Sequence, residues 1–419
     1  MYKFTRHFLF IQNNDQIIVG NKYMCTYLKI SKECYDILEQ LIQNGIDIHR
    51  YSQVFEESED LEYFQKLTEL LLQKRILVET QDEESIRSYS IQWELTNECN
   101  LSCRHCIADA CTVRQSSDEN KLIYDIADSI ISLTPESLTI TGGEPMVLSC
   151  FFELSAYIKG QYENELMLMT NGTLITAENA KQIASIFDKI FISIDGVDEE
   201  TCRTIRGAGV FGKVVNAIRY LKEAGMKKIS LSMVLTNENR VYKDKFYELC
   251  SKWGVTPMLR SFAPVGRGKN YQDWYVSSEK RFISNDSVDG NLVDEKRSSQ
   301  PDVKFGSCGG RYGSVTIAPT GDIFLCAPYE YTNQSVGNIT KIENVRDFFW
   351  MEKYKETKVY REFELKMPEY LEKCKDCNVR YFCWHCPFLF EQTVKNDRNF
   401  DLYCRHKKEN LTFALWGEV

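Results

Sequence analysis

Ten of the sixteen cysteines in this 419-residue chain stand in groups with the spacing of metal ligands. The chain opens with MYKFTRHFLFIQNND, in which the apolar run FLFI is too short for the core of a signal peptide. We therefore expect a cytoplasmic protein, and cytosolic thiols are kept reduced. Bound metal ions or clusters thus explain the grouped cysteines better than disulfides do. The six scattered cysteines are interpreted as small buried apolar side chains.

The charge and hydropathy of the chain argue against two classes of partner. Its 51 basic and 60 acidic residues give a net charge of −9, which argues against nucleic acid, because phosphate binding needs clustered Lys and Arg. No uncharged stretch of about 18 apolar residues occurs, so we expect no membrane-spanning helix. The predicted protein is soluble.

The centre of the chain, roughly residues 90–275, alternates between strand-like and helix-like segments. Apolar runs typical of strands cover 90–96, 137–142, 165–172, 189–196, 228–236 and 256–265. Helical periodicity occurs between them, for example over 120–133, 176–187, 209–225 and 239–254. Strands separated by helices pair in parallel, with functional groups at their carboxyl ends. Six such units fall short of the eight of a full barrel, so the sequence predicts an α/β fold with an open, partial (β/α)6 barrel.

The first cysteine group directly follows the first predicted strand. Cys99, Cys103 and Cys106 are spaced C-x3-C-x2-C, so three thiolates converge from one compact loop. Soft thiolates select iron–sulfur clusters or zinc. Three protein ligands leave one iron of a cube free to bind a small molecule, whereas a zinc knuckle would need His105 or a distant residue as its fourth ligand. Cys111 is a conceivable fourth ligand but lies outside the tight spacing.

The second predicted strand ends in TGGEP, residues 141–145. Two glycines let a backbone approach a polar ligand closely, and Glu144 could accept a hydrogen bond from an ammonium group. The GGEP sequence is common in turns and carries little information alone. Together with the preceding C-x3-C-x2-C loop, it makes the chain resemble the radical S-adenosylmethionine (SAM) superfamily over roughly residues 90–275.

The resemblance implies a cofactor site and its residues. The [4Fe–4S] cluster, whose open iron binds the amino and carboxylate groups of SAM, would be held by Cys99, Cys103 and Cys106. The methionyl amino group would contact Gly142, Gly143 and Glu144. Family members contact the ribose or the carboxylate of SAM at positions that correspond here to Thr170, Asn171, Ser193, Asp195 and Arg206. These last five also suit strand-end caps and turns. A 5′-deoxyadenosyl radical made from SAM would abstract hydrogen from the substrate.

The second group of cysteines lies in the turn-rich segment 305–419. Seven cysteines there exceed the ligands of one zinc ion, which favours two metal centres. The pattern resembles the SPASM extension of radical SAM enzymes that modify peptides and proteins, which implies two auxiliary [4Fe–4S] clusters. One cluster would be held by Cys374, Cys377, Cys383 and Cys404. The other, nearer the active site, would be held by Cys308, Cys326 and Cys386.

This segment departs from the family pattern around Cys386. Two residues rather than three separate it from Cys383, which makes His385 an alternative ligand. No cysteine occurs between Cys308 and Cys326, where sulfatase maturases have one more. We therefore expect an open iron in the inner auxiliary cluster, which could bind a substrate thiolate or remain an electron conduit. Two zinc sites in a binding ribbon are the alternative.

Residues 1–85 begin with strand-like runs at 8–12, 16–20 and 25–30, and helical segments follow at 31–42 and 61–75. This order resembles the precursor-recognition element of ribosomal-peptide maturases, a small winged-helix-like module. The resemblance implies that a leader peptide adds as an extra strand, and the candidate edge is Cys25 to Ile30. A plain winged-helix packing domain is the alternative.

Together these resemblances predict three domains: a recognition module at 1–85, a radical SAM core at 90–275 and a SPASM domain at 305–419. The predicted activity is hydrogen abstraction from a ribosomally made precursor peptide, which installs a thioether crosslink or, as second choice, a C–C or C–O crosslink. A flavodoxin or ferredoxin would supply electrons. The alternatives are maturation of a side chain in a folded protein, as in sulfatase maturation, and a non-catalytic zinc or iron–sulfur protein.

Overall fold

A computed structural model of the chain describes residues 1–80, 89–110, 119–274, 303, 308–311, 313–330, 332, 334–383, 386–388, 390 and 397–417. The chain divides into two compact units. The terminal unit contains Met1–Arg87, Val293–Tyr312 and Phe363–Val419, and the core unit contains Ser88–Leu292 and Gly313–Glu362. Within the described ranges, no helix is long and apolar enough to cross a membrane. Residues 81–88 and most of the segment 275–303 lie outside the described residues.

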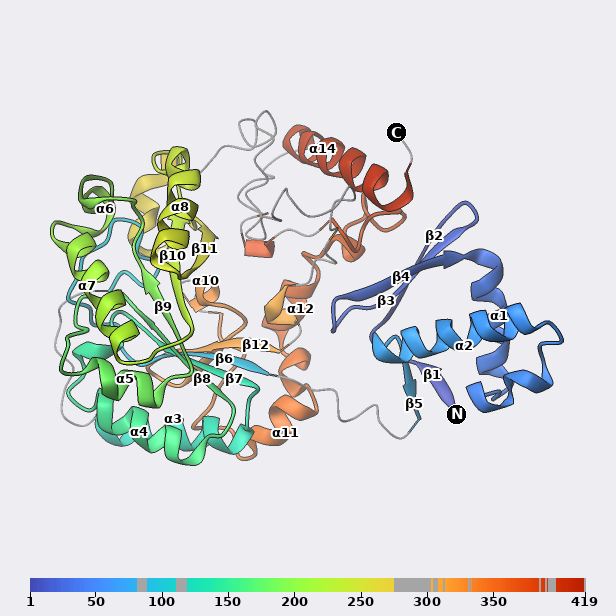
Figure 1. Ribbon diagram of the computed structural model, residues 1–419, viewed down its shortest axis with the longest axis horizontal. Helices are drawn as coiled ribbons and strands as arrows, with labels where there is room; N and C mark the ends of the chain where they lie inside the picture. The colour runs from blue at the N-terminus through green and yellow to red at the C-terminus, as the bar shows by residue number, and fades with distance from the viewer. Residues whose placement is uncertain are drawn as a thin grey trace. The chain divides into compact units, whose positions relative to one another are not determined.

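The core unit is built on a sheet with the strand order β11-β10-β9-β8-β7-β6-β12-β13-β14 (Figure 1). Six of these strands are β6 (Ser90–Glu94), β7 (Ser137–Thr141), β8 (Glu165–Thr170), β9 (Lys189–Ser193), β10 (Ile229–Leu235) and β11 (Thr256–Ser261). Each pairs in parallel with its sequence neighbours. All six correspond to the strands predicted from the sequence, so the predicted α/β fold with parallel strands is confirmed.

Helices follow these strands in turn: α3 (Glu119–Leu133), α4 (Phe151–Gln161), α5 (Ala180–Ile186), α6 (Glu199–Arg206), α7 (Val210–Glu223) and α8 (Lys243–Trp253). The strands alternate between two faces. One face is apolar and fully buried, as Leu166, Leu168 and Ile190 show. The opposite face carries half-buried residues such as Thr139 and Ser193. This second, more polar face is the one available to line a site.

Three further strands extend the sheet beyond β6. β12 (Ser314–Ile317) lies parallel to β6, and β13 (Asp322–Phe324) and β14 (Gly337–Asn338) add in antiparallel fashion. This extension could not be predicted from the sequence, because a strand as short as SVTI gives little periodic signal and its partner lies far earlier in the chain. The unit also contains α10 (Ala327–Glu330) and α11 (Val345–Trp350).

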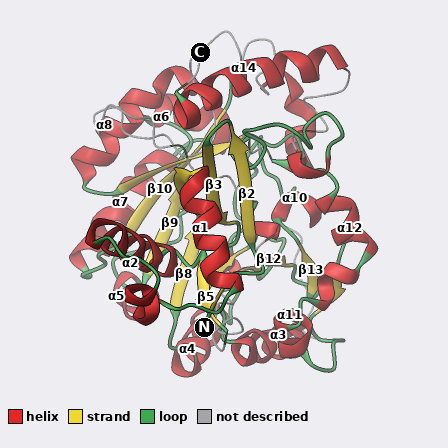
Figure 2. Cartoon of the chain, turned by 90° about the vertical axis from the view of Figure 1, so that its right-hand side faces the viewer, coloured by secondary structure: helices red, strands yellow, loops and turns green. Residues whose placement is uncertain are grey.

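The first part of the terminal unit is an antiparallel sheet in the order β2-β3-β4. Its strands are β2 (Phe8–Asn13), β3 (Gln16–Asn21) and β4 (Thr26–Ser31), and β1 (Tyr2–Phe4) pairs with β5 (Leu77–Glu79). Helices α1 (Lys32–Gln43) and α2 (Ser58–Gln73) follow, and α1 packs on β3 and β4 (Figure 2). Within the described residues β4 pairs only with β3, so the predicted edge at 25–30 coincides with an edge strand. The winged-helix class remains a prediction.

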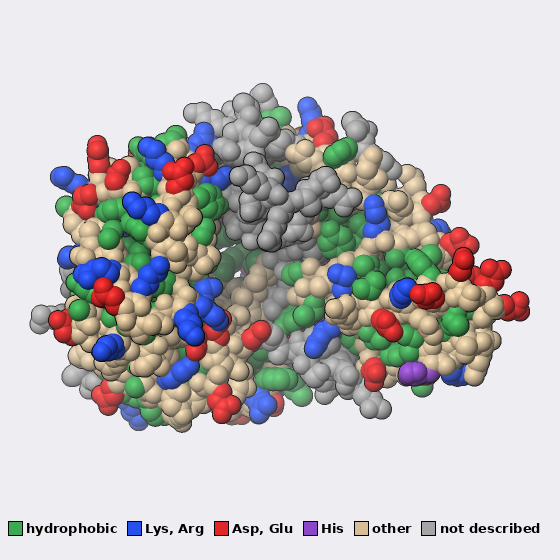
Figure 3. Space-filling model, in the orientation of Figure 1, with side chains coloured by type: hydrophobic (Ala, Val, Ile, Leu, Met, Phe, Trp, Pro, Cys, Tyr) green, Lys and Arg blue, Asp and Glu red, His purple; other side chains and the backbone are tan. Residues whose placement is uncertain are grey.

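The second part of the terminal unit contains cysteine-bearing turns and a long helix. Helix α12 (Lys358–Glu364) belongs mostly to the core unit and precedes the turns, and α14 (Asp397–Trp416) follows them. The sequence analysis did not predict α14, because its apolar residues do not form a continuous stripe. On the molecular face drawn in Figure 3, basic and acidic side chains are interspersed over the described residues, in keeping with the small net charge.

Candidate active site and auxiliary cysteine sites

The cysteine loop after β6 places three thiols close together in the core unit. Cys99 and Cys103 are buried and Cys106 is half-buried. Two of the sulfur atoms accept hydrogen bonds from the loop itself: Leu101 N donates to Cys99 Sγ at 3.4 Å and Ala110 N to Cys106 Sγ at 3.5 Å. Burial raises the pKa of Cys99 to about 11. Thiolates here therefore need a cationic partner, which fits an iron–sulfur cluster with hydrogen-bonded sulfurs.

The GGEP turn after β7 is wedged against this loop. Gly143 N donates to Thr96 O at 2.6 Å, and Glu144 N donates to Glu98 O at 2.8 Å. A Cβ atom would lie 2.5 Å from Thr96 O on Gly142 and 2.1 Å from Glu98 O on Gly143. From the sequence, both glycines were expected to let the backbone approach a ligand closely. The structure shows a close approach of these glycines to the backbone of the cysteine loop.

Glu144 is fully buried behind the turn. Its carboxylate accepts hydrogen bonds from Thr170 Oγ1 at 2.7 Å, Asn171 N at 2.7 Å and Met146 N at 3.3 Å. Burial raises the pKa of Glu144, and these hydrogen bonds oppose that shift. Asn171 Nδ2 also lies 3.8 Å from Cys99 Sγ. Three predicted site residues at the ends of β7 and β8 therefore meet beside the cysteine loop.

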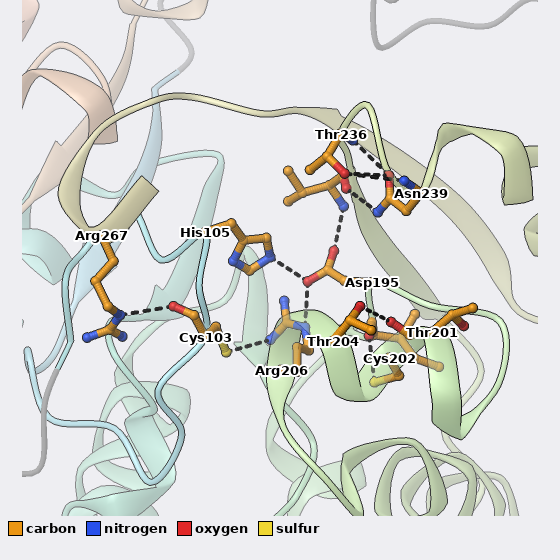
Figure 4. A network of polar contacts seen from close by, with 12 residues as sticks. Cys103, His105, Asp195, Thr201, Cys202, Thr204, Arg206, Thr236, Asn239 and Arg267 are labelled. Carbon is orange, nitrogen blue, oxygen red and sulfur yellow. Dashed lines mark hydrogen bonds and ion pairs between the residues drawn. The ribbon is translucent and has the colours of Figure 1, made fainter. Parts of the chain in front are cut away.

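Asp195 links the cysteine loop to β10 and α6 (Figure 4). One of its oxygens contacts His105 Nε2 at 2.5 Å and Arg206 Nε at 2.6 Å, and the other accepts from Val234 N at 2.6 Å. Arg206 Nη1 lies 3.8 Å from Cys103 Sγ. Burial alone would raise the pKa of Asp195, but the charges of Arg206 and His105 hold it well below its usual value. The carboxylate is thus ionised and is bonded to the cysteine loop, α6 and β10.

Asp195 has a backbone φ of +58°, in the left-handed region that Asp and Asn tolerate best among side-chain residues. Ser193, two residues earlier, is half-buried at the end of β9. Its side chain makes no hydrogen bond to another described residue in the structure. Asp195 therefore belongs to a hydrogen-bond network of described residues, and the side chain of Ser193 does not.

Two residues close to the cysteines were not predicted as part of a SAM site. His105 was considered only as a zinc ligand, whereas its Nε2 atom is bound to Asp195. Arg267, just after β11, donates from Nε to Cys103 O at 2.9 Å and from Nη1 to Ala110 O at 2.8 Å. Arg267 could have been suspected from the sequence as a basic residue after the last parallel strand. The carboxyl ends of parallel strands lie at one edge of the sheet, and the cysteine loop lies at the same edge.

Gly266 allows the Arg267 segment to approach the cysteine loop. Its φ is +54°, and a Cβ atom there would lie 2.3 Å from Ile107 O. The backbone N of Arg267 donates to Cys106 O at 3.0 Å. The cysteine loop is therefore clamped from two sides, by the GGEP turn and by the segment after β11.

Four cysteines of the terminal unit line one cavity of about 250 Å³: Cys374, Cys377, Cys383 and Cys404. We call this cavity the outer site. Burial raises the pKa of Cys374 to about 11 and that of Cys383 to about 12. The basic side chains of Lys373 and Lys408 also line it. Four half-buried thiols around one space fit a cubane cluster, and the set is the one that the family resemblance implies.

The remaining predicted ligands fall in both units. Cys308 and Cys386 lie in the terminal unit, where burial raises the pKa of Cys308 to about 12 and the nearby Cys386 adds to that shift. Cys326 lies in the core unit, directly before α10. Cys111 and His385 lie outside the described residues. The roles of Cys308, Cys326 and Cys386 as ligands stay a prediction.

Comparison with known families decides the class of the protein. A model described as the radical SAM superfamily matches residues 93–250, the segment that carries the cysteine loop and the GGEP turn. Residues 93–250 of the chain are therefore a domain of the radical SAM superfamily. A second model, SPASM, described as an iron–sulfur cluster-binding domain, matches residues 308–378. The cofactors of this radical SAM enzyme are therefore SAM, the [4Fe–4S] cluster that binds it, and auxiliary clusters.

Several relatives of this radical SAM enzyme have names that describe an activity. Mycofactocin maturase MftC of Mycobacterium tuberculosis is 28% identical over 302 residues, which cover 68% of this chain and 75% of MftC. An AdoMet-dependent heme synthase of Nitratidesulfovibrio vulgaris is 29% identical over 361 residues, covering 77% of this chain and 93% of the synthase. Streptococcus suis SuiB, solved with the precursor peptide SuiA, shares the fold, with a TM-score of 0.55, 15% identity and coverage of 95% and 97%.

Proposed function

We propose that this radical SAM enzyme is a peptide maturase that installs a crosslink in a ribosomally made precursor peptide. The observation that carries the proposal is the clamped cysteine loop beside the buried Glu144, on a chain that also has a SPASM match. Two comparisons support a peptide substrate. MftC is named a maturase, and SuiB was solved with a precursor peptide.

In this proposal the core unit binds SAM through its own residues. When bound, the cluster and SAM supply an electron and a carbon radical that abstracts hydrogen. Cys99, Cys103 and Cys106 hold the cluster, and Glu144 with the adjacent glycines orients the amino group of SAM. Asp195 and Arg206 fix the loop from the other side, because both are buried and paired with each other. Thr170, Asn171 and Ser193 complete the surroundings of SAM.

The bond that we propose first is a thioether. One hydrogen atom leaves a carbon of the peptide for the deoxyadenosyl group, and the thiol of a peptide cysteine loses its proton. One electron leaves through the auxiliary sites, and the carbon–sulfur bond closes. The basis is the absence of a cysteine between Cys308 and Cys326 in the sequence, which leaves a place for a substrate thiolate. A C–C or C–O crosslink is the second choice.

The N-terminal module offers a place for the leader of such a peptide. β4 is an edge strand within the described residues, and an extended peptide can add to a strand edge through main-chain hydrogen bonds. We place the reaction in the cytoplasm, with a flavodoxin or ferredoxin as electron donor. The leader-binding role of residues 1–85 is part of the proposal.

The test uses the full chain, reconstituted without oxygen and reduced with dithionite. The substrate is a small cysteine-containing peptide encoded beside this protein. We expect 5′-deoxyadenosine in step with a peptide that is lighter by the mass of two hydrogen atoms per crosslink. Alkylation of the remaining thiols distinguishes a thioether from the other bonds. A methylated peptide, or metal-loaded protein that never cleaves SAM in the presence of its peptide, would refute the proposal.

A further inference from the structure

The N-terminal sheet is apolar on both faces. Neighbouring residues on β3 point to opposite sides: Ile17 and Val19 belong to the core formed with α1 and α2, and Ile18 belongs to a different core. Ile18 shares that second core with Leu9 and Ile11 of β2. All of these side chains are at most 2% exposed. The second face of the sheet is therefore covered by something other than the module's own helices.

Residues of the segments that form the outer site cover this second face. Val379, Phe382, Leu415 and Trp416 pack into the same core as Ile18, and Cys377 packs against it. The ring of Phe382 meets Tyr27 of β4 edge-on, with 5.0 Å between ring centroids. Phe382 directly precedes Cys383, a residue of the outer site.

Polar contacts fix the register between the sheet and the outer site. Asn378 Nδ2 donates to Asn13 Oδ1 of β2 at 2.8 Å. Trp416 Nε1 donates to Asn378 O at 3.2 Å. Lys29 Nζ of β4 donates to Leu415 O at 3.0 Å, near the end of the helix that carries Cys404. These contacts hold both cysteine-bearing segments of the outer site on one sheet.

The segment Cys374–Cys383 thus has two kinds of residue. Its cysteines line the cavity, while Asn378 and Phe382 between them contact the sheet. The segment consists of turns and has no helix or strand of its own to position the thiols. Its geometry is therefore set by what it packs on.

We propose that the N-terminal sheet positions the cysteines of the outer site, so that residues 1–31 are a structural part of an iron–sulfur centre in addition to their proposed role in leader binding. The inference needs only the ligand role of the four cysteines and is independent of a peptide substrate. In this view Ile18 is a positioning residue: it acts on the cluster through Phe382 and Val379.

Strand β3 provides a matched pair of variants for the test. Ile18→Ala removes a buried side chain from the face under the outer site, and Ile17→Ala removes the same group from the opposite face of the same strand. Both side chains are at most 1% exposed. Each variant is prepared as the full chain under anaerobic conditions. Iron per chain, iron release to a chelator and the electron paramagnetic resonance of the reduced clusters are measured.

We expect about 12 irons per chain for the wild type and for Ile17→Ala, and about 8 for Ile18→Ala, with loss of one cluster signal. The conservative Ile18→Val should retain the iron. If Ile18→Ala does not fold, the comparison is made between Ile18→Val and Ile17→Val, and iron should be released faster from the former. Equal iron loss in both positions, or full retention in Ile18→Ala with wild-type spectra, overturns the inference. SAM cleavage by dithionite-reduced wild type is scored separately, because its absence would count only against the proposed function.

Discussion

Replacing Asp195 by asparagine tests whether the buried ion pairs beside the cysteine loop hold the core unit together. Asparagine has nearly the same size and also tolerates the left-handed backbone at φ +58°. The substitution therefore removes the charge without forcing the backbone to move. Arg206 and His105, whose side chains are 9% and 7% exposed, lose their carboxylate partner.

The expected cost follows from leaving a buried guanidinium unpaired. Removing one partner of a buried ion pair costs about 3–5 kcal/mol. Each kcal/mol shifts the unfolding midpoint of a unit of this size by about 2–4 °C. We therefore expect Asp195→Asn to lower the midpoint of the core unit by about 6–20 °C.

Calorimetry or circular dichroism of the anaerobic protein measures this shift. Asp125→Asn is the matched control, because Asp125 is exposed on α3 and the same charge is removed. It should change the free energy of unfolding by less than about 0.5 kcal/mol. If Asp195→Asn behaves like Asp125→Asn, the network does not stabilise the unit and the reasoning is refuted.

The pH dependence of the same pair of proteins gives a second check. Burial would raise the pKa of Asp195, but Arg206 and His105 lower it below the unfolded value of about 3.9. A carboxyl with a depressed pKa contributes its full stability above the unfolded pKa and loses it as the pH falls through the folded pKa. The difference between wild type and Asp195→Asn should therefore persist at neutral pH and shrink only in strong acid.

Three further substitutions address the cluster sites. Gly143→Ala puts a methyl group 2.1 Å from Glu98 O, so we expect iron analysis to show loss of about 4 of about 12 irons, whereas Gly212→Ala, with nothing within 4 Å, should lose none. Glu144→Gln replaces a buried acceptor oxygen with an amide NH2 that faces other donors, at a cost of about 1–3 kcal/mol, so equilibrium dialysis should show SAM binding weakened by about 5- to 150-fold; unchanged binding would contradict the role of Glu144. Cys404→Ala should remove about a third of the iron while dithionite-driven SAM cleavage continues, and loss of that cleavage would contradict the separation of the two sites.

The sequence was sufficient for those parts of the structure that follow from local pattern. The six parallel strands have strong apolar runs, and the cysteine loop and GGEP turn lie directly at strand ends. The contact between Arg267 and Cys103 O could not be predicted, because it joins the segment after β11, the last parallel strand, to the loop after β6, the first. The partner of His105 was missed for the same reason: it is Asp195, which follows another strand, β9.

Long-range packing was the other gap. Strand β12 and helix α14 were not predicted, since both gain their stability from distant partners more than from local propensity. The second apolar face of the N-terminal sheet gave no sign of its partner either. Alternation shows that Ile18 is buried away from Ile17, but it does not name Phe382 or Val379 as the residues that cover it.

That second face has a consequence for how the chain is made. Ile18 leaves the ribosome long before Val379, and at about 5–20 residues per second the roughly 360 residues between them take roughly 20–70 s to synthesise. During this interval a sheet formed by the nascent chain would lack the residues that cover Leu9, Ile11 and Ile18 in the folded protein. A chaperone that shields apolar strands is therefore expected to accompany the emerging polypeptide until its last helix arrives.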